Sequence, residues 1–158
     1  MEPTDSYKKL LSEARELYDS VGKISCPALG DVYFTSEGFH HLRYESSVNN
    51  KPGKERSKLE RRNKLSHINF AIETLKCSTT IQEYRLLLEP VGLKDSKGFR
   101  AMANVHYYAF WAVLNKRTRV KVIVKQIENG KLIFWSVMPY WVLIKGQKIF
   151  GSAKLAYE

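Results

Sequence analysis

Cysteine and long apolar runs are scarce in this sequence. Two of its 158 residues are cysteines, Cys26 and Cys77, which is too few for a disulfide framework, and we expect both to be reduced thiols. The longest apolar runs fall far short of the about 18 residues that a membrane helix needs. The polar start, Met-Glu-Pro-Thr, also lacks the pattern of a secretory signal. These absences predict a cytoplasmic protein with no membrane partner.

The signatures of several enzyme classes are missing as well. The sequence holds no glycine-rich phosphate loop of the GxxxxGK type and no dinucleotide-binding fingerprint. Its histidines and cysteines are scattered, without the pair spacing of zinc ligands. Its carboxylates do not gather as the two-metal mechanism of many nucleases requires. We therefore expect neither a cofactor nor a metal ion.

Positive charge, in contrast, is abundant and concentrated. Lys and Arg number 26 against 16 Asp and Glu, which gives a net charge of +10. Residues 43–64 contain 8 basic and 3 acidic residues, and residues 116–131 contain 6 basic and 1 acidic residue, so these two segments hold the whole excess. Such concentration predicts a contact surface for a polyanion, although two solvated basic faces would give the same counts.

Apolar spacing predicts helices in the first half of the chain. Apolar side chains recurring every three or four residues indicate a helix over residues 7–21, closed by Gly22. Thr35 or Ser36 is suited to begin a short second helix. A third helix is predicted over residues 56–76, with an apolar stripe on one side and basic residues near its start.

The second half has the β-branched and aromatic residues of an antiparallel sheet. Strands are predicted over residues 104–114, 119–127 and 132–138, and an Asn-Gly pair joins the last two as a hairpin. Residues 81–88 fit a strand or a helical turn, and the pattern does not decide between them. We divide the chain into a helical arm, residues 1–25, and one domain, residues 26–158.

The middle predicted strand alternates valines with basic residues. Successive side chains of a strand point to opposite faces of the sheet. We therefore expect the valines to pack against the helices and the basic residues to line an open face. An open face with cations, aromatic rings and a hydroxyl suits the phosphates and bases of RNA. The two sets are Val120, Val122 and Val124, and Arg119, Lys121 and Lys125.

RNA can be cleaved without a metal, because its own 2′-hydroxyl attacks the neighbouring phosphate. The enzyme then supplies a proton carrier with a pKa near neutrality and cations for the charge that develops. Histidine suits the first task, and Arg and Lys suit the second. The sequence contains all three, as would a basic protein that binds RNA without cleaving it.

Several short blocks between residues 26 and 139 carry a resemblance to a known family. In order they are Cys-Pro-Ala-Leu-Gly at 26–30, Glu-Gly-Phe-His-His-Leu at 37–42, Arg-Ser at 56–57, Arg-Arg-Asn-Lys-Leu at 61–65, Ser-Thr-Thr-Ile-Gln-Glu-Tyr at 78–84, and 120–126 followed by Phe-Trp-Ser-Val at 134–137. With these blocks the chain resembles the phage-associated barnase/EndoU/colicin D/RelE-like nuclease family.

The resemblance implies an α+β fold, with N-terminal helices packed on one face of an antiparallel β-sheet. It makes residues 26–158 a single nuclease-like domain. The implied activity is metal-independent endoribonuclease cleavage by attack of the 2′-hydroxyl on the phosphodiester. The implied role is that of a toxin or phage-borne effector. Its partners would be an RNA (tRNA, mRNA or rRNA) and an antitoxin or immunity protein.

The resemblance also assigns roles to individual residues. His41 would carry the proton, with His40 as the substitute. Arg56 and Lys125 would stabilise the phosphorane, and Ser136 would hydrogen-bond a phosphate oxygen. Lys125 stands where the family has arginine, which keeps the charge but loses bidentate geometry. Further contacts to RNA are expected from Arg61, Arg62, Lys64, Arg119, Lys121 and Tyr108.

Three functions compete at this point. The first is the endoribonuclease. The second is a non-catalytic RNA-binding module that uses the same basic sheet face. The third is an inactive nuclease fold that binds a protein. Each candidate residue also has a purely structural alternative, such as a buried histidine bonded to backbone, a solvated arginine or a strand hydroxyl. Cleavage of RNA in EDTA separates the first function from the others.

Overall fold

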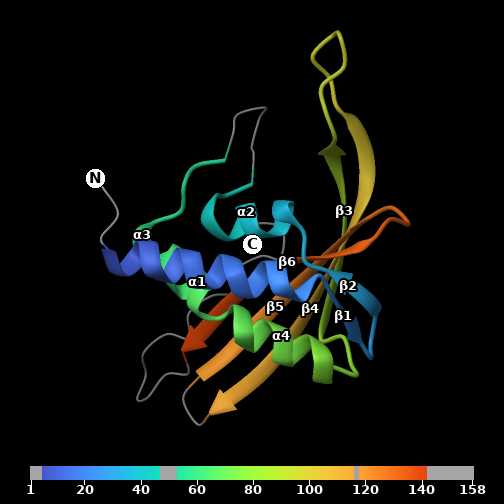
Figure 1. Cartoon of the computed structure of the whole chain (residues 1–158). Helices are drawn as coiled ribbons and strands as arrows, with labels where there is room; N and C mark the ends of the chain where they lie inside the picture. Colours follow the sequence, from blue (N-terminus) through green and yellow to red (C-terminus); the bar gives the residue numbers. More distant parts are fainter. Residues whose placement is uncertain (1–4, 47–52, 116–117, 142–158) are drawn as a thin grey trace, which may run out of the picture.

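The structure of the chain is a computed structural model, which describes residues 5–46, 53–115 and 118–141 (Figure 1). It is an α+β protein, which confirms the predicted class. None of the described helices is long and apolar enough to span a membrane. The helices are α1 (Asp5–Val21), α2 (Ser36–Arg43), α3 (Lys58–Ser66) and α4 (Ile68–Cys77). The strands are β1 (Lys23–Cys26), β2 (Gly30–Tyr33), β3 (Glu83–Val91), β4 (Ala101–Asn115), β5 (Thr118–Ile127) and β6 (Leu132–Trp141).

The strands form one sheet in the order β1-β2-β6-β5-β4-β3. Neighbouring strands are antiparallel except β2 and β6, which run parallel and pair at Val32 with Leu132 and at Tyr33 with Ile133. The expected all-antiparallel sheet is therefore wrong, and the sheet is mixed. The reason is the long connection between β2 and β6, which carries three helices and three strands and lets β6 arrive beside β2 in the same direction.

Helices α1 and α4 lie across one face of the sheet (Figure 1). The valines of β5, at positions 120, 122 and 124, are fully buried beneath the helices, as their alternation predicts. Helix α1 contributes Tyr7, Ala14 and Tyr18 to the same core. Gly22, with a φ of 68°, ends α1 where expected, because this left-handed backbone suits glycine best.

The predicted helix over residues 56–76 is wrong, because the chain breaks at His67 into α3 and α4. The His67 Nδ1 lies 2.6 Å from the carbonyl oxygen of Asn63, which can only accept, so the ring nitrogen donates. In an unbroken helix that carbonyl would accept the backbone N–H of His67. The backbone N–H instead donates to the carbonyl oxygen of Lys64 (3.3 Å), and α3 ends at Ser66 before α4 begins at Ile68.

One strand that the sequence leaves undecided is formed, and the predicted end of another needs correction. Residues 83–91 form β3, because they pair along their whole length with β4. Strand β6 continues to Trp141, past the predicted end at 138. Among the described residues, its pairing with β2 stops at Ile133. Pro139 has no N–H to donate, and it lies where β6 needs no hydrogen bond to β2.

The predicted open basic face of β5 is covered at Lys121, whereas Arg119 is exposed and Lys125 is half-buried. Lys121 is only 2% exposed. Its ammonium lies 3.2 Å from Glu83 and 5.3 Å from the centre of the Trp111 ring. Aromatic and acidic side chains of β3 and β4 therefore enclose the lysine stem and pair its charge. A second, smaller apolar cluster fills this face: Val105, Tyr107, Ala109, Ile123 and Trp135.

Candidate functional site

A β-bulge in β6 creates the site. Ile123 pairs with Ser136, but the next residue, Val124, pairs with Phe134, so Trp135 is an extra residue. Phe134 is buried with the helices, whereas Trp135 belongs to the cluster on the other face with Ile123. Because an extra residue interrupts the strict alternation of a strand, Trp135 and Ser136 lie side by side on that second face.

Helix α2 packs against β6 beyond the point where β2 stops. Thr35 caps its start by accepting the N–H of Gly38 (3.2 Å). Gly38 lies so close to β6 that a Cβ there would overlap the carbonyl oxygen of Phe134. This close approach brings His41 over the indole of Trp135, with ring centres 4.2 Å apart and an interplanar angle of 17°.

Arg56 holds His41 with two hydrogen bonds. Its Nε donates to the carbonyl oxygen of His41 (3.0 Å), and its Nη2 lies 3.2 Å from the His41 Nε2. A guanidinium only donates, so the His41 Nε2 accepts and the ring proton sits on Nδ1. Both residues are buried, His41 at 3% and Arg56 at 7% exposure, and the outer end of Arg56 lies 3.6 Å from Glu60.

The environment keeps the His41 imidazole neutral. Burial, followed by the charges of Arg56, Lys64 and Lys125, lowers the pKa of His41 from 6.5 to about 2. At neutral pH the ring therefore has no proton to donate from Nε2, and its Nε2 lone pair is occupied by Arg56. In this arrangement the His41 imidazole accepts a hydrogen bond from the guanidinium and helps to position it. This matches the structural alternative for His41, a buried histidine, rather than the expected proton carrier.

Lys64 joins the site from α3. Its Nζ donates to the Ser136 Oγ at 2.7 Å, and both side chains are buried. The sequence places Lys64 among the contacts to RNA backbone and Ser136 among the catalytic residues, with no sign that they touch. The break between α3 and α4 and the bulge in β6 bring them together, so the hydroxyl and the ammonium act as one hydrogen-bonded pair.

Lys125 completes the site from β5. Its Nζ lies 3.8 Å from the centre of the Trp135 ring. Burial lowers the pKa of Lys125, and the charges of Glu37 and Glu89 partly oppose that shift. We call Arg56, Lys64 and Lys125, with His41, Trp135 and Ser136, the cationic cluster.

The other predicted RNA contacts lie elsewhere. Arg61 and Arg62 stack on Tyr7 of α1, at 4.9 and 5.9 Å, and so tie α3 to α1. Tyr108 faces the helix side of the sheet, where its hydroxyl donates to Gln126 (3.2 Å). Lys121 is paired with Glu83 as described, and Arg119 is exposed on the same strand. The prediction missed Trp135 as a site residue, and no sequence signal separates it from core aromatics.

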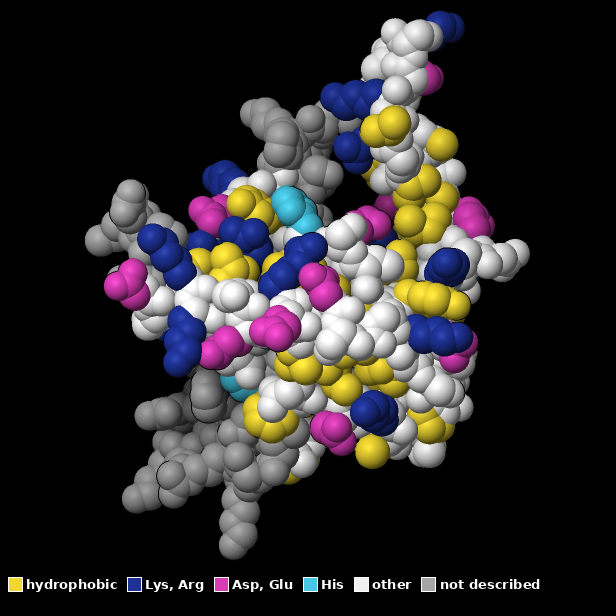
Figure 2. Space-filling model, in the orientation of Figure 1, with side chains coloured by type: hydrophobic (Ala, Val, Ile, Leu, Met, Phe, Trp, Pro, Cys, Tyr) yellow, Lys and Arg dark blue, Asp and Glu magenta, His cyan; other side chains and the backbone are white. Residues whose placement is uncertain are grey.

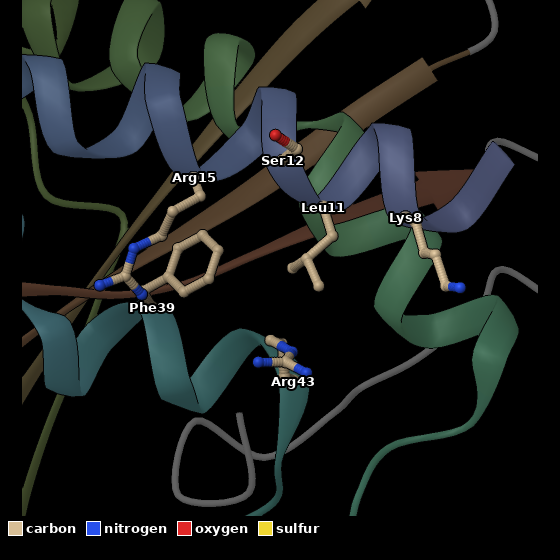
Figure 3. Close-up of a pocket in the computed structure, with 6 residues that line it drawn as sticks. All are labelled: Lys8, Leu11, Ser12, Arg15, Phe39 and Arg43. Carbon is tan, nitrogen blue, oxygen red and sulfur yellow. The ribbon is translucent and has the colours of Figure 1, made fainter. Parts of the chain in front are cut away.

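A second basic surface lies on the far side of α2. A groove of about 330 Å³ runs between α1 and α2 (Figure 3), with Leu11 and Phe39 between its basic residues. Arg15 covers the Phe39 ring at 4.6 Å. Phe39 and Arg43 are four residues apart and share one helix face, whereas His41 projects to the other. Helix α2 therefore separates the groove from the cationic cluster.

The neutral state of His41 predicts an acid-sensitive fold. The pKa of His41 is about 2 in the folded protein and about 6.5 in an unfolded chain. Between these values the unfolded chain binds the extra proton. The folding stability is therefore complete above pH 6.5 and falls as the pH is lowered, by up to about 1.4 kcal/mol per pH unit.

His41→Gln tests this, because a glutamine oxygen can still accept from Arg56 but does not titrate. Urea unfolding at pH 7 and pH 5 should show wild type losing about 2 kcal/mol more than the variant. His40→Gln, one residue away and exposed, is the matched control and should behave like wild type. Equal pH dependence in wild type and His41→Gln would contradict a neutral, buried imidazole.

The donors of the cationic cluster are of the kind that bind anions. It gathers three cations, a hydroxyl and a neutral imidazole, and the described residues include no group of three His, Cys, Asp or Glu side chains that could hold a metal ion. Fixed donors in a buried site stabilise an oxyanion far better than donors in water do. Arg and Lys donors of this kind bind carboxylate and phosphate groups. No family model, curated protein or solved structure matches this chain.

Proposed function

We propose that this chain is a metal-independent endoribonuclease that acts on a phosphodiester at the cationic cluster. The observation that carries the proposal is a convergence. The four residues to which the family resemblance assigns catalysis come from four elements or loops and meet around Trp135 and Lys64: His41, Arg56, Lys125 and Ser136. Residues scattered over almost a hundred positions gather in one place, as a phosphate site requires.

The proposed reaction uses each cation of the cluster. The 2′-oxygen forms a bond to phosphorus, the bond to the 5′-oxygen breaks, and the 2′-hydroxyl proton leaves to solvent. Arg56 and the Lys64–Ser136 pair neutralise the phosphorane oxygens. Lys125 gives a proton to the leaving 5′-oxygen, because a lysine whose pKa is lowered is the better acid. The products carry a 2′,3′-cyclic phosphate and a 5′-hydroxyl.

This scheme moves the proton transfer from His41 to Lys125. His41 is neutral and its Nε2 faces Arg56, whereas Lys125 is half-buried and so more open to a substrate. His41 then positions Arg56, and Arg56 contacts the phosphate.

One observation favours the alternative, a non-catalytic RNA-binding module. His41, Arg56, Lys64 and Ser136 are all more than nine-tenths buried. A phosphate therefore reaches Arg56, Lys64 and Ser136 only if the cluster opens. Such a module would bind RNA with a steep dependence on salt, as backbone contacts do, and would leave the RNA intact.

An RNA cleavage assay tests the proposal. Wild type, Lys125→Met and Lys131→Met are incubated in EDTA with total RNA and with a tRNA pool, and the product ends are mapped. Lys131 is an exposed lysine stacked on Tyr33 at 4.6 Å and serves as the matched control. We expect cyclic phosphate ends from wild type and from the control. Loss of the general acid should slow Lys125→Met by about a hundredfold or more.

The other outcomes are equally informative. RNA that stays intact in EDTA and with added divalent metal, together with salt-sensitive binding, identifies the binding module. Absence of both cleavage and binding removes RNA as the partner and leaves the protein-interaction domain. Cleavage that Lys125→Met does not slow would remove Lys125 from the reaction.

A further inference from the structure

Strand β3 is a long edge of the sheet, and its outer side faces no strand in the part of the chain that the structure describes. One of its faces is apolar and open: Tyr84, Leu86 and Leu88 are 52%, 50% and 65% exposed, and Met102 of β4 extends the patch. Hydrophobic side chains gather over the β3–β4 arm at the upper right of Figure 2. A long apolar edge is a template for pairing with another strand.

The hydrogen bonds of β4 reveal which peptide groups of β3 point outward. The N–H of Trp111 donates to the side chain of Gln82 (3.2 Å), and the carbonyl of Ala109 accepts the N–H of Gln82 (3.1 Å). Asn104 instead exchanges bonds with Glu128, next to β5. Odd residues of β4 therefore face β3 and pair with its odd residues. The outward groups belong to Tyr84, Leu86, Leu88 and Pro90.

The charged residues of β3 fit an antiparallel pairing of this strand with the same strand of a second copy. Arg85, Leu87 and Glu89 point to the face opposite the apolar patch. In a two-fold antiparallel pairing centred on Leu87, Arg85 lies opposite Glu89 of the second copy, and Glu89 lies opposite its Arg85. In a register centred on Leu86, Glu83 lies opposite Glu89 of the second copy, so like charges meet. In a register centred on Leu88, neither Arg85 nor Glu89 has an opposite charge facing it.

We propose that the chain pairs with a second copy of itself through β3, in the antiparallel register centred on Leu87. The outward N–H and C=O groups of Leu86 bond to those of Leu88 in the other copy, and the N–H of Tyr84 donates to the carbonyl of Pro90. The same contact sets Leu86 against Leu88 and joins the two apolar patches. The sheet becomes continuous across both copies. This pairing does not rest on the proposed RNA cleavage.

The solution mass of the full chain tests the pairing. Sedimentation velocity over about 5–500 µM protein at physiological salt should show a concentration-dependent dimer, since one strand pair and one patch make a small interface. Arg85→Glu places like charges opposite each other twice and should raise the dimer Kd by about tenfold to a hundredfold. Arg85→Glu combined with Glu89→Lys exchanges the charges and should restore the dimer. Thermal unfolding of each variant verifies that it folds.

Disulfide trapping tests the register. In a background with Cys77, an exposed free thiol, replaced by serine, Leu87→Cys places two thiols on the two-fold axis. Facing residues of a non-hydrogen-bonded pair have Cα atoms about 4.5 Å apart, within disulfide range. Leu86→Cys is the matched control, because its own counterpart lies on the diagonal, at about 7–8 Å.

A dimer in which Leu87→Cys cross-links and Leu86→Cys does not supports the proposal. A protein that stays monomeric at the highest concentration would overturn it. So would cross-linking of Leu86→Cys in preference to Leu87→Cys, or a dimer that Arg85→Glu leaves unchanged. None of these readouts depends on RNA, so failure of the pairing and failure of the nuclease proposal are separate results.

Discussion

Arg56→Lys is expected to slow RNA cleavage by about 10²–10³-fold. Lysine keeps the positive charge but presents a single ammonium in place of a planar fork. It cannot bond both the carbonyl oxygen and the Nε2 of His41, as Arg56 does, and still direct a donor at a phosphate. The loss should fall on kcat, because the donor matters most to the charge that develops in the transition state.

The measurement is single-turnover cleavage of a defined RNA in EDTA. Arg15→Lys makes the same exchange on α1, where Arg15 pairs with Asp19 at 3.1 Å, and should cleave at the wild-type rate. Urea unfolding of both variants separates a catalytic loss from a loss of fold. If Arg56→Lys cleaves as fast as Arg15→Lys, the phosphate does not sit at the cationic cluster.

Gly38→Ala is expected to lower the free energy of unfolding by about 3 kcal/mol. The added Cβ would overlap the carbonyl oxygen of Phe134 and lie 2.7 Å from the hydroxyl of Tyr18. Both neighbours are held in place, Phe134 by the sheet and the Tyr18 hydroxyl by its bond to the carbonyl of Thr35 (2.7 Å). Helix α2 must therefore move away from β6.

The direction of this effect opposes helix propensity. In an exposed helix the same exchange would stabilise by up to about 1 kcal/mol, so a net loss isolates the close approach. Ser36→Ala, at an exposed position in the first turn of α2, is the control and should change the free energy of unfolding by less than about 0.5 kcal/mol. Chemical denaturation of the three proteins measures the difference. Equal stability of Gly38→Ala and wild type would refute the close approach of α2 to β6.

Displacement of α2 should also reach the site. His41 stacks on Trp135 only because the helix comes so close, and Arg56 is bonded to His41. Gly38→Ala is thus expected to cleave RNA poorly even at temperatures where it remains folded. The fluorescence of Trp135, which contacts the imidazole and Lys125, should change along with the activity.

Local patterns in the sequence determined the helical first half and the β-rich second half, the first helix and its end, the capped start of α2 and the buried valines of β5. These features follow from a period of 3.6 or 2 and from the conformational preferences of residues such as Thr35 and Gly22. Each depends on residues within a few positions of one another, which a sequence displays directly.

Contacts between distant residues decided the rest. The His67 side chain bonds to the Asn63 carbonyl where α3 ends. Residues 83–91 form a strand because they pair with β4, and Lys121 is buried because Glu83 and Trp111 contact it. The bulge at Trp135 depends on how β6 pairs with β5. The family resemblance selects four candidate residues, and the tertiary structure brings them together and lowers the pKa of the His41 imidazole. The pKa and the exposed fraction of a side chain such as His41 depend on its surroundings, and these surroundings exist only once the chain has folded.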